Sequence, residues 1–310
     1  MKLAVYLCLT LPVFGQKLEL LPGNVELTTP ESRQQVIAQF TGAEVSQDMT
    51  PQSRWSSANP AVAKVDAAGI VTPVANGETT LSATASGRTA TAKVRVTGMD
   101  KPFQWSFRNH VIPVLTKMGC NQGACHGALA GKNGFKLTLR GYDPEVDYDT
   151  LTRQSVGRRI SLAEPSDSLL LKKAAFALPH GGGKRFDTNS LEYRVIAEWI
   201  ALGTPEPKAA DPEVVALEVY PGRAILAPGA EQQLVVRARY SDNRLEDVTR
   251  WVKFSSNNEG VATVDDWGKV KMTGRGEAAI TLWYSSRVLY ARVTVPFDNA
   301  VTAADYSRFQ

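Results

Sequence analysis

Two stretches of this 310-residue chain repeat one another without a gap, at one constant separation. Pro22 pairs with Pro221, which sets the offset at 221 − 22 = 199 positions. The other matches at this offset are 21–23 with 220–222, 48–50 with 247–249, 55–59 with 254–258, 62–66 with 261–265, and Gly69 and Gly77 with Gly268 and Gly276. Chance does not keep one offset across so many motifs. The two copies are therefore predicted to share one fold and to enclose a segment of a different kind.

Each copy reads as an all-β unit. Glycine, proline, asparagine and aspartate break short apolar or alternating stretches at the spacing typical of a sandwich. The predicted strands include 35–40, 80–85 and 89–96 in the first copy, and 233–240, 278–284 and 288–295 in the second. Residues 65–71 form a predicted hairpin in which Gly69 is free to adopt a positive φ. Trp55 and Phe254 are expected to be core aromatics rather than binding residues, because a lone aromatic in an alternating strand usually packs inward.

These copies resemble the group 2 bacterial immunoglobulin-like (Ig-like) domain. The resemblance rests on the opening Pro-Gly, the Asp-Val-Thr near the middle, the Trp-Ser-Ser-x-Asn strand, the Val-Ala-x-Val-Asp hairpin and the late glycine. It implies Ig-like domains at residues 17–98 and 212–296. Domains of this family serve as spacers and surface modules in exported proteins, and the family supplies no catalytic residues.

The N-terminal end of the chain points to export. Lys2 precedes an apolar run from Leu3 to Phe14, which is typical of a signal peptide over residues 1–16 and too short to span a membrane. The alternative is a buried first strand. Cys8 lies in this run, so Cys120 and Cys125 are the two cysteines of the mature chain. Residues 297–310 look like a linker or the start of a further domain, and the expected location is the periplasm or the cell surface.

The middle segment, residues 99–207, holds all three histidines and shows helical periodicity. Apolar residues share one helical face in 107–118, in 169–176 behind a Ser166 cap, and in 191–202 behind Asn189 or Ser190. The expected fold class is therefore multidomain, with two all-β Ig-like sandwiches flanking a mainly α domain. The acidic stretch 143–149 is expected to be a solvated loop or a weak calcium site.

The motif that carries chemistry runs from Cys120 to His126. A cysteine directly before a histidine, with a second cysteine nearby, has the form of the c-type haem signature. In that chemistry the thiols bond the porphyrin vinyl groups and the histidine ligates the iron from below. Four residues separate Cys120 from Cys125 instead of the usual two, which leaves attachment through both thiols open.

The whole middle segment resembles the cytochrome c-like domain of large exported planctomycete proteins. The resemblance rests on an ordered set of motifs, which are Val111–Leu115, Cys120, Cys125–Gly127, Pro165–Leu170, Leu178–Gly183 and Tyr193–Gly203. It implies a covalent haem c with iron, bound by Cys120, Cys125 and His126. It also implies an electron-transfer or redox-sensing module with a redox partner protein of unknown identity.

The middle segment offers few side chains that could be the distal iron ligand. Related domains place Met-Pro in the loop before the last helix, and here Leu178 stands at the methionine position. His180 follows in a loop of three glycines and is the favoured distal metal ligand beside His126. His110, as a solvent-facing or capping residue, and Met118, as a core residue, are the competitors. Without ligation, His180 is a surface loop residue.

The main alternative is a haem-free cell-surface or adhesion protein in which Cys120 and Cys125 form a disulfide.

The basic pairs 158–159, 172–173 and 184–185 are either solvated surface or partners for haem propionates or an acidic protein. The net charge of +4 is too small to indicate nucleic-acid binding, and no segment predicts a transmembrane span. No catalytic motif predicts an enzyme, and contacts with the cell envelope are expected through the Ig-like domains.

Overall fold

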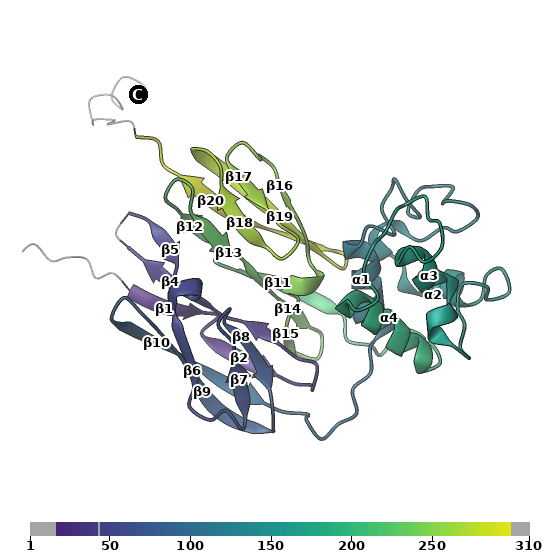
Figure 1. Ribbon diagram of the computed structural model, residues 1–310, viewed down its shortest axis with the longest axis horizontal. Coiled ribbons are helices and arrows are strands. Elements are labelled where there is room, and N and C mark those ends of the chain that lie inside the picture. The colour runs from purple at the N-terminus through teal and green to yellow at the C-terminus, as the bar shows by residue number, and fades with distance from the viewer. Residues whose placement is uncertain (1–16, 43, 299–310) are drawn as a thin grey trace, which may run out of the picture.

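The computed structural model describes residues 17–42 and 44–298. The expected signal peptide, residues 1–16, and the stretch 299–310 lie outside the described residues. Figure 1 shows two β-sandwiches side by side, with the middle segment at one end of the C-terminal sandwich. The chain crosses from the N-terminal sandwich to the middle segment through a long connection without strands.

The N-terminal sandwich consists, in the described residues, of short strands and one 3₁₀ turn. Its strands are β1 (Lys17–Leu21), β2 (Asn24–Leu27), β3 (Gln34–Gln35), β4 (Ile37–Thr41), β5 (Ser46–Asp48), β6 (Arg54–Ser57), β7 (Ala63–Val65), β8 (Ile70–Pro73), β9 (Gly77–Ala85) and β10 (Arg88–Val96), with η1 at Thr50–Gln52. Apolar and polar residues alternate along β10, whose even positions from Ala90 to Val96 are buried.

The C-terminal sandwich repeats this sequence of elements. Its strands are β11 (Val214–Tyr220), β12 (Arg223–Ile225), β13 (Glu231–Gln233), β14 (Val235–Tyr240), β15 (Leu245–Asp247), β16 (Lys253–Ser256), β17 (Ala262–Val264), β18 (Lys269–Met272), β19 (Gly276–Tyr284) and β20 (Arg287–Val295), with η5 at Thr249–Trp251. Each strand therefore has a counterpart ten labels earlier in the chain.

The strand order is the same in both copies. The N-terminal sandwich contains sheets β1-β4-β5, β2-β10-β9-β6 and β3-β8-β7, and the C-terminal sandwich contains β11-β14-β15, β12-β20-β19-β16 and β13-β18-β17. The long pairs β9–β10 and β19–β20 are antiparallel, whereas β2 and β12 join β10 and β20 in parallel. The prediction of two sandwiches with one topology is confirmed.

The hairpin glycine and the two core aromatics lie together. Gly69 has a φ of 74°, and a Cβ placed there would come within 2.3 Å of the Val36 carbonyl oxygen and 3.0 Å of the Trp55 ring. Its counterpart Gly268 has a φ of 82° and packs against the Phe254 ring. Phe254 is buried and Trp55 is half-buried, which agrees with their expected core role. Both positions need glycine for two reasons. The turn requires a positive φ, and a side chain would collide with the neighbouring aromatic ring.

Two hydrophobic cores divide the described chain unequally. One core belongs to the N-terminal sandwich alone and is formed by residues between Leu18 and Val96. The other is continuous from Trp105 in the middle segment to Val295 at the end of the C-terminal sandwich. The middle segment is therefore built onto the C-terminal sandwich, while the N-terminal sandwich folds around its own core.

The middle segment combines short helices with turns and irregular backbone. Its helices are the π-helical turn η2 (Phe107–Val111), α1 (Ile112–Lys117), η3 (Leu139–Gly141), α2 (Pro144–Thr152), η4 (Pro165–Asp167), α3 (Leu169–Ala174) and α4 (Leu191–Ala201). The three helices predicted from apolar periodicity are present as η2–α1, α3 and α4. Ser190 caps α4 by accepting a hydrogen bond from the Tyr193 N–H.

The expected fold class is wrong for the middle segment. The described chain is dominated by the six sheets of the two sandwiches, and the four α-helices have six, nine, six and eleven residues. These short helices do not make a mainly α cytochrome domain. Periodicity located the helices, but many of the residues between them form turns, including three successive positive-φ residues at 155–157.

The acidic stretch 143–149 is also not a loop. Pro144 begins α2, and the Asp143 side chain caps the helix by accepting a hydrogen bond from the Val146 N–H. Asp147 turns inward, and both its carboxylate oxygens accept hydrogen bonds from Thr138, at 2.6 Å from N–H and 2.8 Å from the hydroxyl. A carboxylate used in this way is a structural group, so the calcium alternative is not supported.

Polar and aromatic contacts join the middle segment to the C-terminal sandwich. Lys117 at the end of α1 donates to the Arg250 and Asp266 carbonyl oxygens at 2.5 and 2.8 Å. The Arg140 guanidinium lies 3.3 Å from the centre of the Trp283 ring. Together with the shared core, these contacts hold the middle segment in a fixed place on the sandwich.

Candidate ligand cleft in the middle segment

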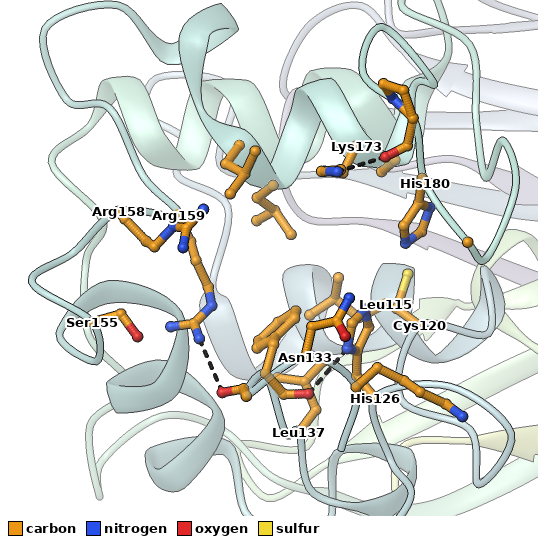
Figure 2. Close-up of a pocket in the computed structure, with 18 residues that line it drawn as sticks. Leu115, Cys120, His126, Asn133, Leu137, Ser155, Arg158, Arg159, Lys173 and His180 are labelled. Carbon is orange, nitrogen blue, oxygen red and sulfur yellow. Dashed lines mark hydrogen bonds between the residues drawn. The ribbon is translucent and has the colours of Figure 1, made fainter.

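A cleft of about 370 Å³ opens in the middle segment. Leucines from α1 and α3, together with Phe135 and Leu137, form much of its wall (Figure 2). The full lining is Leu115, Cys120, His126, Lys132, Asn133, Gly134, Phe135, Leu137, Ser155, Arg158, Arg159, Leu169, Leu170, Lys173, Ala174, Pro179, His180 and Gly181. An apolar wall with a few convergent polar groups is typical of a small-molecule site.

His126 is positioned by the turn that follows α1. The His126 N–H donates to the Cys120 carbonyl oxygen at 3.0 Å, and its own carbonyl accepts from the Leu137 N–H at 2.8 Å. Gly127 is required here, because a Cβ would come within 2.1 Å of the Asn121 carbonyl oxygen. The ring Nδ1 lies 3.1 Å from the Phe135 carbonyl oxygen. A hydrogen bond from Nδ1 to this carbonyl leaves Nε2 without a proton and available to a ligand.

His180 is held by its own glycine loop. Its Nδ1 lies 2.8 Å from the Gly183 carbonyl oxygen, three residues along the chain. A Cβ at Gly182 would come within 2.9 Å of the His180 ring, so the backbone of this loop lies close against the histidine. As in His126, bonding of Nδ1 to a carbonyl leaves Nε2 as the free ring nitrogen.

The structure brings His126 and His180 together across the cleft. Their ring centroids are 6.2 Å apart, and the ring planes differ by 9°. Figure 2 shows the two side chains facing one another from opposite sides, with Cys120 beside them. The separation is short enough for one atom to contact a nitrogen of each ring at about 2 Å, the length of a metal–imidazole bond.

The electrostatic surroundings favour a neutral imidazole at His126. Burial lowers the pKa of His126, and the positive charges of Arg159 and Arg185 and the neighbouring His180 act in the same direction. The hydrogen bond to Phe135 opposes this shift and raises the pKa. A neutral ring is the form that can donate a lone pair to a metal or accept a hydrogen bond from a ligand.

The two cysteines have different surroundings. Cys120 lines the cleft, and burial raises the pKa of its thiol to about 12, so this group remains protonated and unreactive. Cys125 is not among the residues that line the cleft. Its Sγ lies 3.5 Å from an Arg185 guanidinium nitrogen. Both are free thiols, so the disulfide of the haem-free alternative is not formed in this structure.

The competing ligands lie away from the cleft. His110 is buried instead of facing solvent, and its Nδ1 accepts a hydrogen bond at 2.9 Å from the N–H of Ser106, the N-cap residue of η2, which agrees with the capping role that was the other alternative. Its Nε2 lies 3.8 Å from Glu246 in the C-terminal sandwich. Met118 packs against the hydrophobic core, as expected.

The basic pairs serve several roles. The Arg159 guanidinium donates to the Thr150 carbonyl oxygen at 2.8 Å and lies over the Phe135 ring, whereas Arg158 is exposed at the cleft. Lys173 also lines the cleft and donates to the Pro179 carbonyl oxygen at 2.5 Å. Lys172 and Lys184 form surface ion pairs with aspartates. The solvated-surface interpretation therefore holds for some members of these pairs only.

Sequence reasoning missed Phe135, whose carbonyl orients His126 and whose ring contacts the imidazole at a centroid distance of 4.3 Å. The signal was the Asn133-Gly134 dipeptide, which favours a tight turn with two positive φ angles. The structure has this turn, with φ angles of 50° and 72°, and a β-bridge joins Lys132 to Phe135.

Two further features bear on the site. Among residues 17–42 and 44–298, no group of three or more His, Cys, Asp or Glu side chains could hold a metal ion. In the same part of the chain, no helix has the length and apolar character needed to cross a membrane.

Comparisons with known proteins concern mainly the sandwiches. Residues 213–295 match the family model described as bacterial Ig-like domain (group 2), and residues 52–87 match the one described as intimin, immunoglobulin-like domain. An S-layer-related protein of Niallia circulans is 41% identical over 76 residues. That stretch is 24% of this chain and 5% of the relative, so this chain covers a small part of the relative's length.

Solved structures align over most of the chain but with low scores. Domains 5–6 of the S-layer protein SbsC are 10% identical, with 92% of this chain and 100% of that chain covered and a TM-score of 0.34. The neural ectodermal development factor IMP-L2 is 11% identical, with 93% and 98% covered and a TM-score of 0.28.

The resemblance of the middle segment to a cytochrome c-like haem domain is wrong as an identification. The matched families are Ig-like, and the comparisons give no support to a haem-binding or cytochrome c family. The associated descriptions as a cytochrome, an electron-transfer module and an iron protein are withdrawn with it. Each of the motifs is short, and together they produced a likeness that neither the family comparisons nor the fold of the segment supports.

Proposed function

We propose that this chain is an exported cell-surface protein whose two Ig-like sandwiches form a scaffold for the middle segment. The observation that carries this proposal is the match of residues 213–295 to the bacterial Ig-like family, together with an N-terminal sandwich of identical strand order. The 76-residue likeness to an S-layer-related protein and the signal-like sequence at 1–16 support the same location.

The arrangement of the domains suits a scaffold. The middle segment shares its hydrophobic core with the C-terminal sandwich, so it is held as a rigid head at one end of the molecule (Figure 1). All the residues that line the cleft belong to this head. A surface protein of this kind exposes a binding site while the sandwiches provide contacts with the cell envelope.

Protease treatment of intact cells tests the location. Cells expressing the chain are treated with a protease that does not enter them, and the chain is followed with an antibody to the C-terminal sandwich. We expect loss of the chain from intact cells, with a cytoplasmic protein unaffected as the control. Full protection in intact cells and digestion only after lysis would refute the proposal.

A second candidate function follows from the facing imidazoles. We propose that the cleft binds one ligand between His126 and His180. Both rings have Nδ1 engaged by a backbone carbonyl and are 6.2 Å apart at their centroids. A hydrogen bond from Nδ1 to a backbone carbonyl is the contact that fixes the tautomer and ring orientation of metal-ligating histidines.

The donor set restricts the class of ligand. Two imidazoles supply half of a tetrahedral metal site, and the Cys120 thiol is held in its protonated form by burial. The described residues add no third strong donor, so the protein alone does not complete a structural zinc site. A suitable ligand brings its own remaining donors, as a metal chelate does, and presents an apolar body to the leucines of the wall.

Haem c with iron, the cofactor expected from the sequence, fits the residues of this cleft only in part. The paired imidazoles and apolar walls suit a planar metal complex. Attachment through both cysteines does not fit, because Cys125 does not line the cleft and its sulfur contacts Arg185 instead. The proposal therefore concerns the histidine pair and includes no covalent step.

The histidine proposal is tested by adding haemin, Cu²⁺ or Zn²⁺ separately to the purified full chain. We expect at least one probe to raise the melting temperature, and His126→Ala and His180→Ala each to abolish the increase. His110→Gln is the matched control, because the third histidine lies outside the cleft. An unchanged melting temperature with every probe, or equal binding by all variants, would refute the site. This binding measurement does not depend on whether the chain is located at the cell surface.

A further inference from the structure

The N-terminal sandwich is joined to the rest of the molecule in a different way from the middle segment. Its hydrophobic core contains only residues up to Val96, with Met99 packed at its margin, whereas the other core begins with Trp105 and is partly covered by Phe103. No apolar core crosses the boundary in the described residues. Interfaces of this type permit movement of one domain relative to the other.

Hydrogen bonds between the sandwiches form a nearly reciprocal pair. Asp48 of the N-terminal sandwich accepts a bond from the Gln233 N–H of the other copy at 2.9 Å. Asp247, the repeat counterpart of Asp48, accepts one from the Gln35 N–H at 2.6 Å. Each copy therefore supplies one carboxylate and one backbone N–H to the other.

Each of these aspartates is fixed within its own sandwich. Asp48 and Asp247 use their second carboxylate oxygen to accept a hydrogen bond from the N–H of Thr50 and Thr249, both at 2.9 Å. The carboxylates are thus held in the docking orientation by the Asp-x-Thr motif of their own copy. They need no rearrangement when the two sandwiches meet.

Further contacts of the N-terminal sandwich with the middle segment and the C-terminal sandwich are polar. Glu31 forms a bidentate ion pair with Arg194 of α4, at 2.7 and 2.8 Å. The amide of Gln232 donates to Gln39 at 3.0 Å, and Arg237 donates to the Asn24 carbonyl oxygen at 3.2 Å. Two cavities of about 220 and 570 Å³, lined by residues of both sandwiches, lie at the same boundary. The interface is therefore polar and incompletely packed.

The connection between the two units is extended. After β10 ends at Val96, no strand or helix occurs until Phe107 in this described stretch. Asn76 ties Met99 and Asp100 to the N-terminal sandwich, which leaves Lys101 and Pro102 as the link before Phe103 packs on the other core. Rotation at this link would carry the N-terminal sandwich away without breaking either hydrophobic core.

We propose that the N-terminal sandwich is an exchangeable arm, which docks on the C-terminal sandwich of a second copy of this chain with the contacts that it makes within its own chain. A second copy is the partner that presents every matching group, because both docking surfaces are encoded in this sequence. Exchange replaces each hydrogen bond by an identical one, so its cost is confined to the link and to the joining of two chains. Reciprocal exchange gives a closed dimer, and sequential exchange gives a chain of molecules.

The experiment uses full-length chains with cysteine at the two positions of one docking bond. The Gln35→Cys/Asp247→Cys double variant is expected to close a disulfide within one chain on mild oxidation, which shows that the pair is within bonding reach. A mixture of the Gln35→Cys and Asp247→Cys single variants is then incubated at increasing concentration before oxidation. We expect a disulfide-linked species of twice the mass, increasing with concentration, on a non-reducing gel.

Each single variant alone, and each mixed with the unsubstituted chain, controls for Cys120, Cys125 and like-with-like disulfides. Closure of the double variant with no linked dimer from the mixture above these controls overturns the proposal. Light scattering of the unsubstituted chain gives an independent reading. We expect its mean mass to rise with concentration, and a monomer mass at the highest soluble concentration also overturns the proposal.

Discussion

Replacing Lys117 with methionine tests the junction between the middle segment and the C-terminal sandwich. The Lys117 side chain is buried, its ammonium group donates to the Arg250 and Asp266 carbonyl oxygens, and it lies 4.5 Å from the centre of the Trp267 ring. Burial lowers the pKa of Lys117 from 10.5 to about 8, against the smaller opposing effect of nearby carboxylates. Methionine keeps the length of the chain and removes the charge and the donors.

The expected effect depends on pH with a defined sign. Between about pH 8 and 10.5 the unfolded chain holds a proton on Lys117 that the folded chain has released, so the free energy of unfolding rises with pH in this window. This lowering of the pKa from 10.5 to about 8 gives a rise in the free energy of unfolding of about 2.5 kcal/mol between pH 7 and pH 10. At pH 7 the loss of two hydrogen bonds is offset by relief of the buried charge, so Lys117→Met costs little there.

Urea denaturation of both proteins at pH 7 and pH 10, followed by tryptophan fluorescence, measures the effect. Comparison of the two proteins cancels the other groups that titrate, including the buried tyrosines. We expect the destabilisation caused by Lys117→Met to be larger at pH 10 than at pH 7 by about 2.5 kcal/mol. The same destabilisation at both pH values would refute the reasoning, because it would mean that the lysine titrates as it does in water.

Three further predictions concern single sites and the free energy of unfolding. Gly69→Ala should cost about 3 kcal/mol, because a positive φ and a backbone clash combine, whereas the control Gly87→Ala, with a φ of 72° and open space around it, should cost about 1 kcal/mol. Burial raises the pKa of Asp147 to about 6 from 3.8, so the wild type should lose about 2 kcal/mol as pH rises from about 4 to 6, and Asp147→Asn should lack this loss in a pH series of urea melts. Arg140→Ala should lower the free energy of unfolding by about 1 kcal/mol, because it removes the contact with the Trp283 ring. A double-mutant cycle with Trp283→Leu should assign most of this loss to the interaction between the two side chains. Strictly additive effects of the two substitutions would contradict the stacking.

The sequence determined the two sandwiches because their signals are local and duplicated. The alternation of buried and exposed residues along a strand such as β10 has a period of two, which no helix shares. The hairpin at Gly69 and the cap at Ser190 depend on neighbours within a few residues, so each was predicted at its correct place. The constant offset of the repeat then transferred every strand of one copy to the other.

The middle segment marks where this reasoning fails. Its helices were found from periodicity, but the identification of the whole segment depended on short motifs whose likeness to a cytochrome c domain the family comparisons do not support. Cys125 illustrates the reason. Its place in the chain indicated a thiol at the cofactor, whereas the turn after α1 directs its sulfur to Arg185.

Only the tertiary structure decided which groups meet across long sequence separations. His126 and His180 face one another because α1 and α3 and two glycine-containing turns place them on opposite walls of one cleft. The bond from the Gln35 N–H to Asp247 joins residues 212 positions apart, and nothing in the local pattern of either residue predicts it. Local sequence fixes backbone conformation through propensity and periodicity, but contacts of this kind depend on how whole domains pack, and that is the sum of many weak interactions.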